Sequence, residues 1–312
     1  MYEQIARNKR RSILYISAFF LAWLGIGAVV GLLFSAIGSS KAGNGPASDV
    51  VTGMLIAALA AAGAIVFTLR SGTRLVLSVA GAVPASCDQY PVLFNLVEAL
   101  ALGDGSPIPA IYVVQDDSPN AFATGLSPAR AAVTVTSGLL AIMDREELEG
   151  VLAHELSHIR NYDTRLLLVV STLIGLAGLL ASLVWRSAFF TRSRGRDGQQ
   201  IMLLIFAAGA LLSIVAFVVG PLIRLALSRR RESLADASAV ELSRNPAGLL
   251  SALRKLQAND TPLKKMNHAT AAMAIDDPLQ HHPSRMHRLF DTHPPLAERI
   301  AVLERMEQGL SV

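Results

Sequence analysis

The sequence has a single cysteine, Cys87, among its 312 residues. One cysteine cannot form an internal disulfide, and it excludes a structural zinc site built from four cysteines. Charged residues are also scarce, at 17%, whereas hydrophobic residues make up 52% of the chain. This balance is too apolar for an ordinary soluble domain. The net charge of +4 comes without a basic stripe interleaved with aromatic residues, so we expect membrane segments and no nucleic-acid partner.

Four long apolar runs predict four membrane-spanning helices. Residues 1–11 form a short basic N-terminus. Residues 12–37 and 50–69 carry no charge, and at ~1.5 Å per residue a helix of either length can cross a hydrocarbon core of ~30 Å. The first of them is much longer than the apolar core of a signal peptide. Residues 166–185 and 201–223 predict the third and fourth spans, so the lipid bilayer is an expected partner.

Basic residues at the ends of these runs predict the orientation. Arg70 and Arg74 follow the second run, which places both this exit and the N-terminus in the cytoplasm. The loop between the third and fourth runs is rich in arginine, although a simple four-span arrangement puts it outside. Either the first two spans dominate the orientation, as we favour, or residues 166–223 form a hairpin that does not fully cross. Both alternatives return the chain to the cytoplasmic side.

Residues 70–165 have the character of a soluble domain and contain a metal-binding motif. His154 and His158 are four residues apart, so on a helix they project from one face and can hold one zinc ion. Glu155 can reach a water on the open side of the metal. Asp144 and Glu147 predict a capping box at the start of this helix. Because His-Glu-x-x-His also occurs by chance, a metal site requires a third protein ligand.

Short β-strands are expected in the same part of the chain. Residues 111–114 and 131–135 have β-type runs, and a helix is predicted over residues 90–102. Between the two runs, residues 118–125 alternate in a way that fits either an exposed edge strand beside the metal-binding helix or an ordinary hairpin. An edge strand would offer unpaired backbone groups to an extended peptide.

The last part of the chain, residues 224–312, supplies a candidate third ligand. Residues 229–240 are predicted to be helical, and Glu232 and Asp236 share a face of this helix. Glu232 could complete a site of two histidines and one glutamate, leaving the fourth position for water. Asp236 could accept a hydrogen bond from the outer N–H of a histidine. Alternatively, both carboxylates pair with the arginines at 229–231 on a solvated face.

Together these motifs resemble the HtpX family of membrane-bound zinc metallopeptidases, relatives of the CAAX prenyl endopeptidase within the gluzincin class. The resemblance covers most of the chain. Its features are, in order, two apolar runs, Asn120-Ala-Phe-Ala123, His154-Glu-x-x-His158, two more apolar runs, Glu232-x-x-x-Asp236 and Thr292-His-Pro-Pro-Leu-Ala-Glu-Arg-Ile300.

The resemblance implies a zinc-dependent endopeptidase of the bacterial cytoplasmic (inner) membrane, with its catalytic domain facing the cytoplasm. His154, His158 and Glu232 would hold one zinc ion per chain. Glu155 would be the general base, and Asp236 would orient a ligand histidine. The substrates would be proteins or peptides, above all misfolded or damaged membrane proteins, which makes protein quality control the expected role.

The resemblance also assigns residues that would contact the substrate. The edge strand that holds it would consist of Asn120, Ala121, Phe122 and Ala123. His293 and Arg299 would line the cleft, where they would stabilise the oxyanion or brace the glutamate helix. Four more histidines fall in a connection that we expect to be mobile or to act as a lid, with a second metal site as the alternative: His268, His281, His282 and His287.

The fold that we expect is mainly α with a small β-sheet (α+β): four hydrophobic helices plus a zincin-like metallopeptidase domain. One rival interpretation is a non-catalytic membrane scaffold or assembly factor stabilised by zinc. Structural zinc sites are usually closed by four protein ligands, however, and here only three are visible. The other rival is a transporter, which would normally carry ionisable residues inside its spans. The four apolar runs have almost none.

Overall fold

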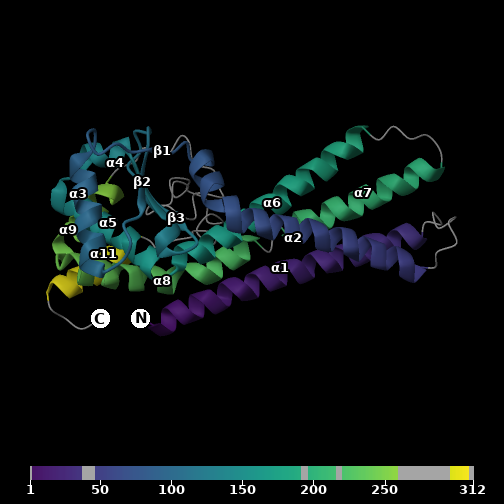
Figure 1. Ribbon diagram of the computed structural model, residues 1–312, viewed down its shortest axis with the longest axis horizontal. Coiled ribbons are helices and arrows are strands. Elements are labelled where there is room, and N and C mark those ends of the chain that lie inside the picture. Colours follow the sequence, from purple (N-terminus) through teal and green to yellow (C-terminus); the bar gives the residue numbers. More distant parts are fainter. Residues whose placement is uncertain (1, 37–45, 191–195, 216–219, 259–295, 309–312) are drawn as a thin grey trace. The chain divides into compact units, whose positions relative to one another are not determined.

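The computed structural model describes residues 2–36, 46–190, 196–215, 220–258 and 296–308. For residues 2–4, 36, 187–190, 196–201, 204 and 220–230 it describes the backbone alone. The chain divides into two compact units (Figure 1). Unit 1 consists of Met1–Arg10, Ser71–Leu168 and Arg224–Val312, and unit 2 consists of Arg11–Arg70 and Val169–Ile223.

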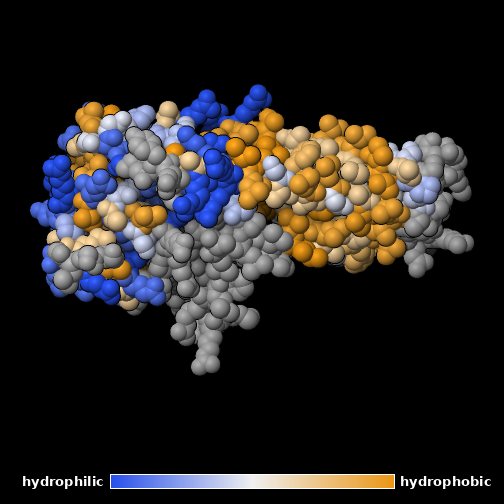
Figure 2. All heavy atoms as spheres, turned by 90° about the horizontal axis from the view of Figure 1, so that it is seen from below, coloured by the Kyte–Doolittle hydropathy of each residue, from blue (hydrophilic) through white to orange (hydrophobic). Residues whose placement is uncertain are grey.

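Unit 2 is built from long apolar helices, which appear as orange surface in Figure 2. They belong to α1 (Tyr2–Ala36), α2 (Pro46–Val79), α6 (Asp163–Phe190) and α7 (Arg196–Ile214). Among the described residues, three segments are long and apolar enough to cross a membrane: Ile5–Ser35, Pro46–Val79 and Asp163–Arg186.

The structure therefore shows three candidate spans among its described residues, where the sequence predicted four. The fourth predicted span, residues 201–223, includes residues 216–219, which lie outside the described residues, and its described parts belong to α7 and to α8 (Gly220–Ser243). The described apolar stretch of α7 is only Ile205–Ile214.

Small residues allow the helices of unit 2 to pack closely. A Cβ atom added to Gly27 of α1 would lie 2.5 Å from the carbonyl oxygen of Gly53 on α2, so no larger side chain fits at this crossing. Such contacts between small residues are typical of membrane helices, because lipid provides no hydrophobic force that would hold two helices together. On α6, the indole N–H of Trp185 donates to the hydroxyl of Ser213 on α7 at 3.1 Å.

Unit 1 contains a four-stranded sheet in the order β1-β2-β4-β3. Its strands are β1 (Val83–Pro84), β2 (Ala110–Val114), β3 (Ala121–Gly125) and β4 (Ala131–Thr136). β2 and β4 are parallel, whereas β3 is antiparallel to β4, with Ala123 opposite Val133. The predicted strands at 111–114 and 131–135 are confirmed. The stretch 118–125 satisfies both of its interpretations, because β3 forms a hairpin with β4 and also lies at the edge of the sheet.

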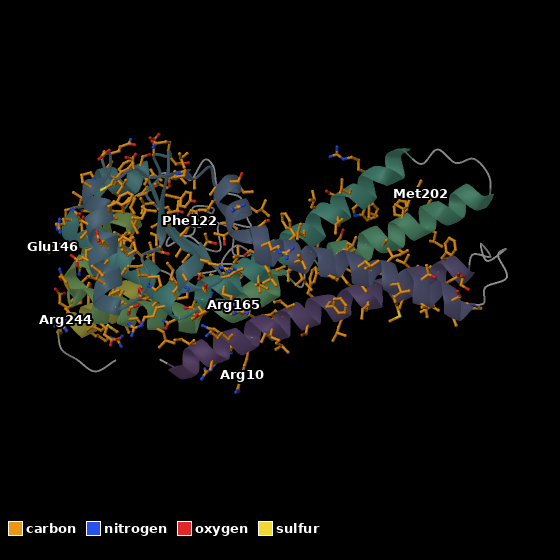
Figure 3. The ribbon with its side chains drawn as sticks, viewed as in Figure 1. Arg10, Phe122, Glu146, Arg165, Met202 and Arg244 are labelled. Carbon is orange, nitrogen blue, oxygen red and sulfur yellow. The ribbon has the colours of Figure 1, made fainter. Side chains whose placement is uncertain are left out.

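The predicted exposure of this edge strand is wrong, because every residue of β3 is buried. Side chains on one face of the sheet, such as Ala123, join the main core with the helix that carries the histidines. On the other face, Phe122 packs in a second core with Leu77 from the end of α2 and Leu168 from the start of α6. The side chain of Phe122 is labelled in Figure 3. Coverage of both faces removes the alternation between exposed and buried positions that a half-solvated strand would show.

Helices cover the main core of unit 1. They are α3 (Pro91–Asp104), α4 (Ser137–Ile142), α5 (Arg145–Arg160), α9 (Pro246–Gln257) and α11 (Leu296–Glu307), with a short 3₁₀ turn η1 (Pro128–Arg130) before β4. The predicted helix at 90–102 is confirmed as α3. α5 and α9 approach closely at Gly150, where an added Cβ atom would lie 2.6 Å from the backbone nitrogen of Leu249.

Candidate metal centre

The helix α5 begins with the capping box that its sequence predicts. The Asp144 carboxylate accepts from the backbone N–H of Glu147, and the Glu147 carboxylate accepts from the backbone N–H of Asp144. Glu147 also accepts from the Ser251 hydroxyl on α9 at 2.7 Å and pairs with Lys255 at 2.5 Å. The first turn of α5 is therefore fixed both to its own backbone and to a neighbouring helix, which sets the direction of the face that carries the histidines.

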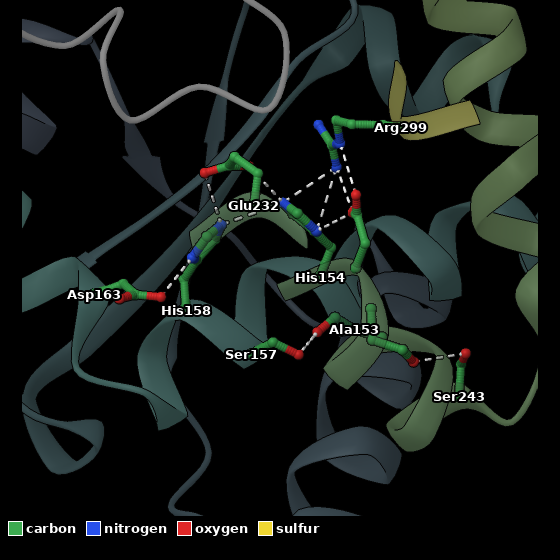
Figure 4. A network of polar contacts seen from close by, with 10 residues as sticks. Ala153, His154, Ser157, His158, Asp163, Glu232, Ser243 and Arg299 are labelled. Atoms are coloured by element: carbon green, nitrogen blue, oxygen red, sulfur yellow. Dashed lines mark hydrogen bonds and ion pairs between the residues drawn. The ribbon is translucent and has the colours of Figure 1, made fainter. Parts of the chain in front are cut away.

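Three side chains from two helices converge at the centre of unit 1 (Figure 4). The two histidine Nε2 atoms, of His154 and His158 on α5, lie 3.2 Å apart. A carboxylate oxygen of Glu232 on α8 lies 3.5 Å from Nε2 of His154, and the other lies 3.7 Å from Nε2 of His158. One potential ligand atom from each residue lies within 4.8 Å of the others, and all three residues are buried.

A carboxylate lies within hydrogen-bond distance of the outer nitrogen, Nδ1, of each imidazole. Nδ1 of His154 lies 2.9 Å from the Asp236 carboxylate, and Nδ1 of His158 lies 3.1 Å from the Asp163 carboxylate. A carboxylate accepts hydrogen bonds, so this environment assigns the N–H to Nδ1 in each neutral ring and the lone pair to Nε2. Two lone pairs and a carboxylate oxygen then face one another in a buried space. A divalent cation satisfies this donor set, and the residues present therefore fit a metal ion.

Arg299 of α11 closes the network on the side of Asp236. Its Nε donates to one Asp236 oxygen at 3.0 Å, and its Nη2 donates to the other at 2.7 Å, in a bidentate pair. Nη2 also lies 3.3 Å from Nδ1 of His154. Asp236 thus pairs with an arginine 63 residues downstream and with His154. The side chains of Arg229 and Arg230, which the alternative interpretation invoked, lie outside the described part of the chain.

The charges around the site shift the pKa values of its members. Burial favours neutral His158, but the Glu232 carboxylate and a hydrogen bond to Asp163 outweigh burial and raise the pKa of His158 to about 10. Burial and the Arg299 charge also oppose protonation of His154, whereas hydrogen bonds to Asp236 and Glu232 raise its pKa overall. Burial would raise the pKa of Asp236, yet the Arg299 charge and then His154 lower it to about 2.

The raised histidine pKa values predict that metal affinity increases with pH. At neutral pH the metal-free site holds a proton on an imidazole, and a metal must displace this proton because it binds the same lone pair. For each proton displaced, the dissociation constant should fall about tenfold per pH unit at any pH below the His158 pKa of about 10. Zinc titrations against a competing chelator at pH 6.5, 7.5 and 8.5 measure this slope, and a constant affinity would contradict it.

The stability of the metal-free fold should decrease as the pH rises, whereas metal affinity increases. The pKa of His158 in the folded chain lies above its unfolded value. Protonation of His158 therefore stabilises the metal-free fold fully below about pH 6.5, and this contribution is lost as the pH rises towards about 10.

Other predicted site residues lie around this network or outside the described chain. Glu155 is buried on α5, and after Asp236 and Glu232 its carboxylate helps raise the pKa of Arg299 against the effect of burial. Asn120 is buried at the start of β3, where its side-chain oxygen accepts from the backbone N–H of Ala121 at 2.8 Å. The residues that lie outside the described ranges are His268, His281, His282, His287 and His293.

Asp163 is a member of the site that no sequence motif indicated. Asp163 is 2% exposed and orients His158 in the same way that Asp236 orients His154. It is also the first residue of α6, where an aspartate is common for reasons of helix capping alone. The only local signal was its place five residues after His158.

Three comparisons relate this chain to known proteins. The profile of peptidase family M48 matches residues 92–307, a range that contains every described residue of the centre. Proteins named "Protease HtpX homolog" are similar over 98% of this chain and 100% of their own length, with 41% identity in Limosilactobacillus fermentum and 37% in Listeria monocytogenes serotype 4a. The crystal structure of S. mikatae Ste24p aligns with a TM-score of 0.49 and 19% identity, over 97% of this chain and 67% of that one.

Proposed function

Because the chain belongs to peptidase family M48, we propose that it is a zinc-dependent endopeptidase that cleaves membrane proteins. The family and the candidate spans already make it a membrane metalloprotease. The proposal adds the identity of the metal, the roles of individual residues and the class of substrate. The observation that carries it is the convergence of ligand atoms from His154, His158 and Glu232 within 4.8 Å, on the helix of Glu155 and the helix that faces it.

The donor set supports zinc as the metal. Two imidazole nitrogens and one carboxylate oxygen form the three-ligand arrangement typical of catalytic zinc in proteases, in which a fourth position stays available. A metal bound by His154, His158 and Glu232 supplies Lewis acidity, which polarises a peptide carbonyl and acidifies water. Asp163 and Asp236 hold the two imidazoles in the tautomer that ligation requires.

Glu155 has the position and environment of a general base. It follows His154 directly on α5 and is buried, and its charge acts on Arg299, which lies 3.3 Å from Nδ1 of His154. In the proposed reaction, Glu155 accepts a proton from the water that attacks the scissile carbonyl and later donates it to the leaving amine. Arg299 is held by both oxygens of Asp236, which supports a role in bracing the α8 carboxylates.

The β3 strand supports binding of an extended substrate. It pairs with β4 on one side and, within the described residues, with no further strand on the other. β3 also packs against α5, so a peptide added along its outer edge would run beside the metal ligands. We assign Asn120, Ala121, Phe122 and Ala123 to this contact, with the backbone of the strand aligning the scissile bond.

The reaction should depend strictly on the metal. After treatment with a chelator, cleavage of an unfolded membrane-protein substrate should fall to background, because Glu155 alone cannot sufficiently activate water. Added zinc should restore the rate in proportion to occupancy, up to one ion per chain. Initial rates and zinc content measured on the same samples provide the test, and full activity in metal-free protein would exclude the proposed chemistry.

We further propose that unit 1 faces the cytoplasm and that the enzyme degrades misfolded or damaged proteins of the bacterial inner membrane. The basic residues Arg7 and Arg11 precede the first apolar run, and Arg70 and Arg74 lie at the end of the second. Positive charge of this kind is retained on the cytoplasmic side during insertion. A catalytic unit on that side could reach the cytoplasmic segments of damaged membrane proteins.

The single exposed cysteine tests this orientation. Cys87 lies in unit 1 and is solvent-exposed, so a thiol reagent that reaches the correct side of the membrane should label it. We expect a membrane-impermeant maleimide to leave the chain unlabelled in intact cells and to label it after permeabilisation. The Cys87→Ser variant controls for other reactive groups. Labelling of intact cells would place unit 1 outside the cytoplasm.

A further inference from the structure

Asn8 is an unusual residue in the basic N-terminal turns of α1. Its neighbours Arg7, Lys9 and Arg10 are exposed, and Figure 3 shows the Arg10 side chain pointing into open space. Asn8 is 0% exposed. A polar amide buried to this extent requires hydrogen-bond partners, since an unsatisfied amide in a dry interior is costly. The partners of Asn8 therefore indicate what it does.

The Asn8 amide donates to two oxygens next to the metal centre. Nδ2 lies 2.9 Å from the backbone oxygen of Asn161 and 2.7 Å from Oδ1 of Asp163. The other oxygen of Asp163, Oδ2, lies 3.1 Å from Nδ1 of His158. Asp163 is thus held between the amide of α1 and the imidazole of α5. Its carboxylate cannot rotate towards His158 or away from it without breaking the bond to Asn8.

Contacts from α1 reach the corner between α5 and α6, which consists of Asn161, Tyr162 and the first residue of α6, Asp163. Asn8 bonds to Asn161 and Asp163, and the Lys9 ammonium lies 4.3 Å from the centroid of the Tyr162 ring. Tyr162 has a φ of 60°, a left-handed conformation that is uncommon outside glycine. A strained corner of this kind persists only where surrounding contacts fix it, and α1 provides such contacts.

We propose that Asn8 is a positioning residue of the metal centre, which fixes the Asp163 carboxylate and through it the His158 imidazole. The proposal rests on the proposed function, because it assumes that His158 binds the metal. Its consequence is that the first turns of the N-terminal helix support a ligand about 150 residues downstream. Carboxylates that orient ligand histidines affect metal affinity by ~10–100-fold, and Asn8 acts on one of them.

The test replaces Asn8 with leucine, which is similar in size but cannot donate a hydrogen bond. In full-length protein, zinc affinity measured against a competing chelator should weaken about tenfold, at the low end of the effect of such orienting groups. The visible spectrum of the cobalt-loaded protein should change as well, because the His158 ring loses its fixed direction. Lys9→Met removes the contact with the Tyr162 ring but keeps both bonds of Asn8, so it should weaken zinc affinity much less than Asn8→Leu does, whereas an equal loss would overturn the assignment to Asn8. Arg10→Gln serves as the exposed control.

A double-mutant cycle separates positioning from a general loss of stability. In an Asp163→Ala background Asn8 has no carboxylate to hold, so Asn8→Leu should cause no further loss of zinc affinity. A purely structural role would reduce affinity by the same factor in both backgrounds and would overturn the proposal. Unchanged affinity and cobalt spectrum in Asn8→Leu would also overturn it. If wild-type protein bound no metal in this centre, the proposed function itself would fail, which is a distinct result.

Discussion

Replacing Glu155 with glutamine should abolish peptide cleavage while the protein keeps its metal. The substitution preserves the size of the side chain and leaves the ligands His154, His158 and Glu232 in place. Glutamine cannot accept the proton of the attacking water, and general base catalysis typically contributes ~10²–10⁴-fold to the rate. We therefore expect the turnover number to fall by about this factor, with zinc content close to one ion per chain. Initial rates on a membrane-protein substrate, together with metal analysis, measure both quantities.

A matched control comes from the same helix. Glu146 is an exposed glutamate in the first turn of α5, and its side chain is labelled in Figure 3. Glu146→Gln makes the same chemical change outside the buried centre and should retain wild-type turnover. If Glu155→Gln cleaved substrate as fast as Glu146→Gln, the assignment of the general base would be wrong, even though the metal site could still exist.

Replacing Glu232 with alanine should remove the metal from most molecules. The Glu232 carboxylate is the only negatively charged member of the proposed ligand set, and it is 1% exposed. Without it, two neutral imidazoles remain to bind a divalent cation, and the His158 imidazole loses the carboxylate that does most to raise its pKa. Cleavage should fall to background in parallel. Zinc content after dialysis against a weak chelator is the direct measurement.

The control for this variant is Glu241→Ala, which changes an exposed glutamate on the same helix, α8. It should bind zinc and cleave substrate as the wild type does. Glu232→Ala protein that retained a full complement of zinc would show that the third ligand comes from another residue. In that case the convergence of α5 and α8 would have a structural cause unrelated to metal binding.

The features of the site that depend on neighbouring residues were predictable from the sequence. The capping box of Asp144 and Glu147 and the four-residue spacing of His154 and His158 follow from helix geometry alone. They are also present as predicted, because each depends on backbone that the helix itself determines. The presence and type of β2, β4 and α3 were predictable for the same reason.

The features that depend on distant parts of the chain were not predictable in the same way. Pattern alone left Asp236 between two partners, a histidine or a local arginine, and the structure pairs it with His154 and with Arg299, 63 residues away. The sequence indicated only that Asp163 could begin a helix. It indicated only that Asn8 lies in a basic segment. Each side chain acquires its partner through tertiary packing, which no local spacing encodes.

The exposure that the sequence predicts for β3 is wrong for a physical reason. The sequence of β3 alternates as a half-exposed strand would, but Leu77 and Leu168 cover its second face from segments far away in the chain. The local pattern of the strand could not indicate this coverage, because it comes from tertiary packing.

The most direct test of the central claim is X-ray absorption spectroscopy at the zinc edge of the metal-loaded protein. The proposed centre predicts two imidazole nitrogens and at least one oxygen at about 2.0–2.2 Å, with no sulfur. The imidazole contribution should shrink in His154→Ala protein, if any metal remains bound. A spectrum without imidazole, or one that is identical in wild type and His154→Ala, would contradict the claim that His154, His158 and Glu232 together hold the catalytic metal.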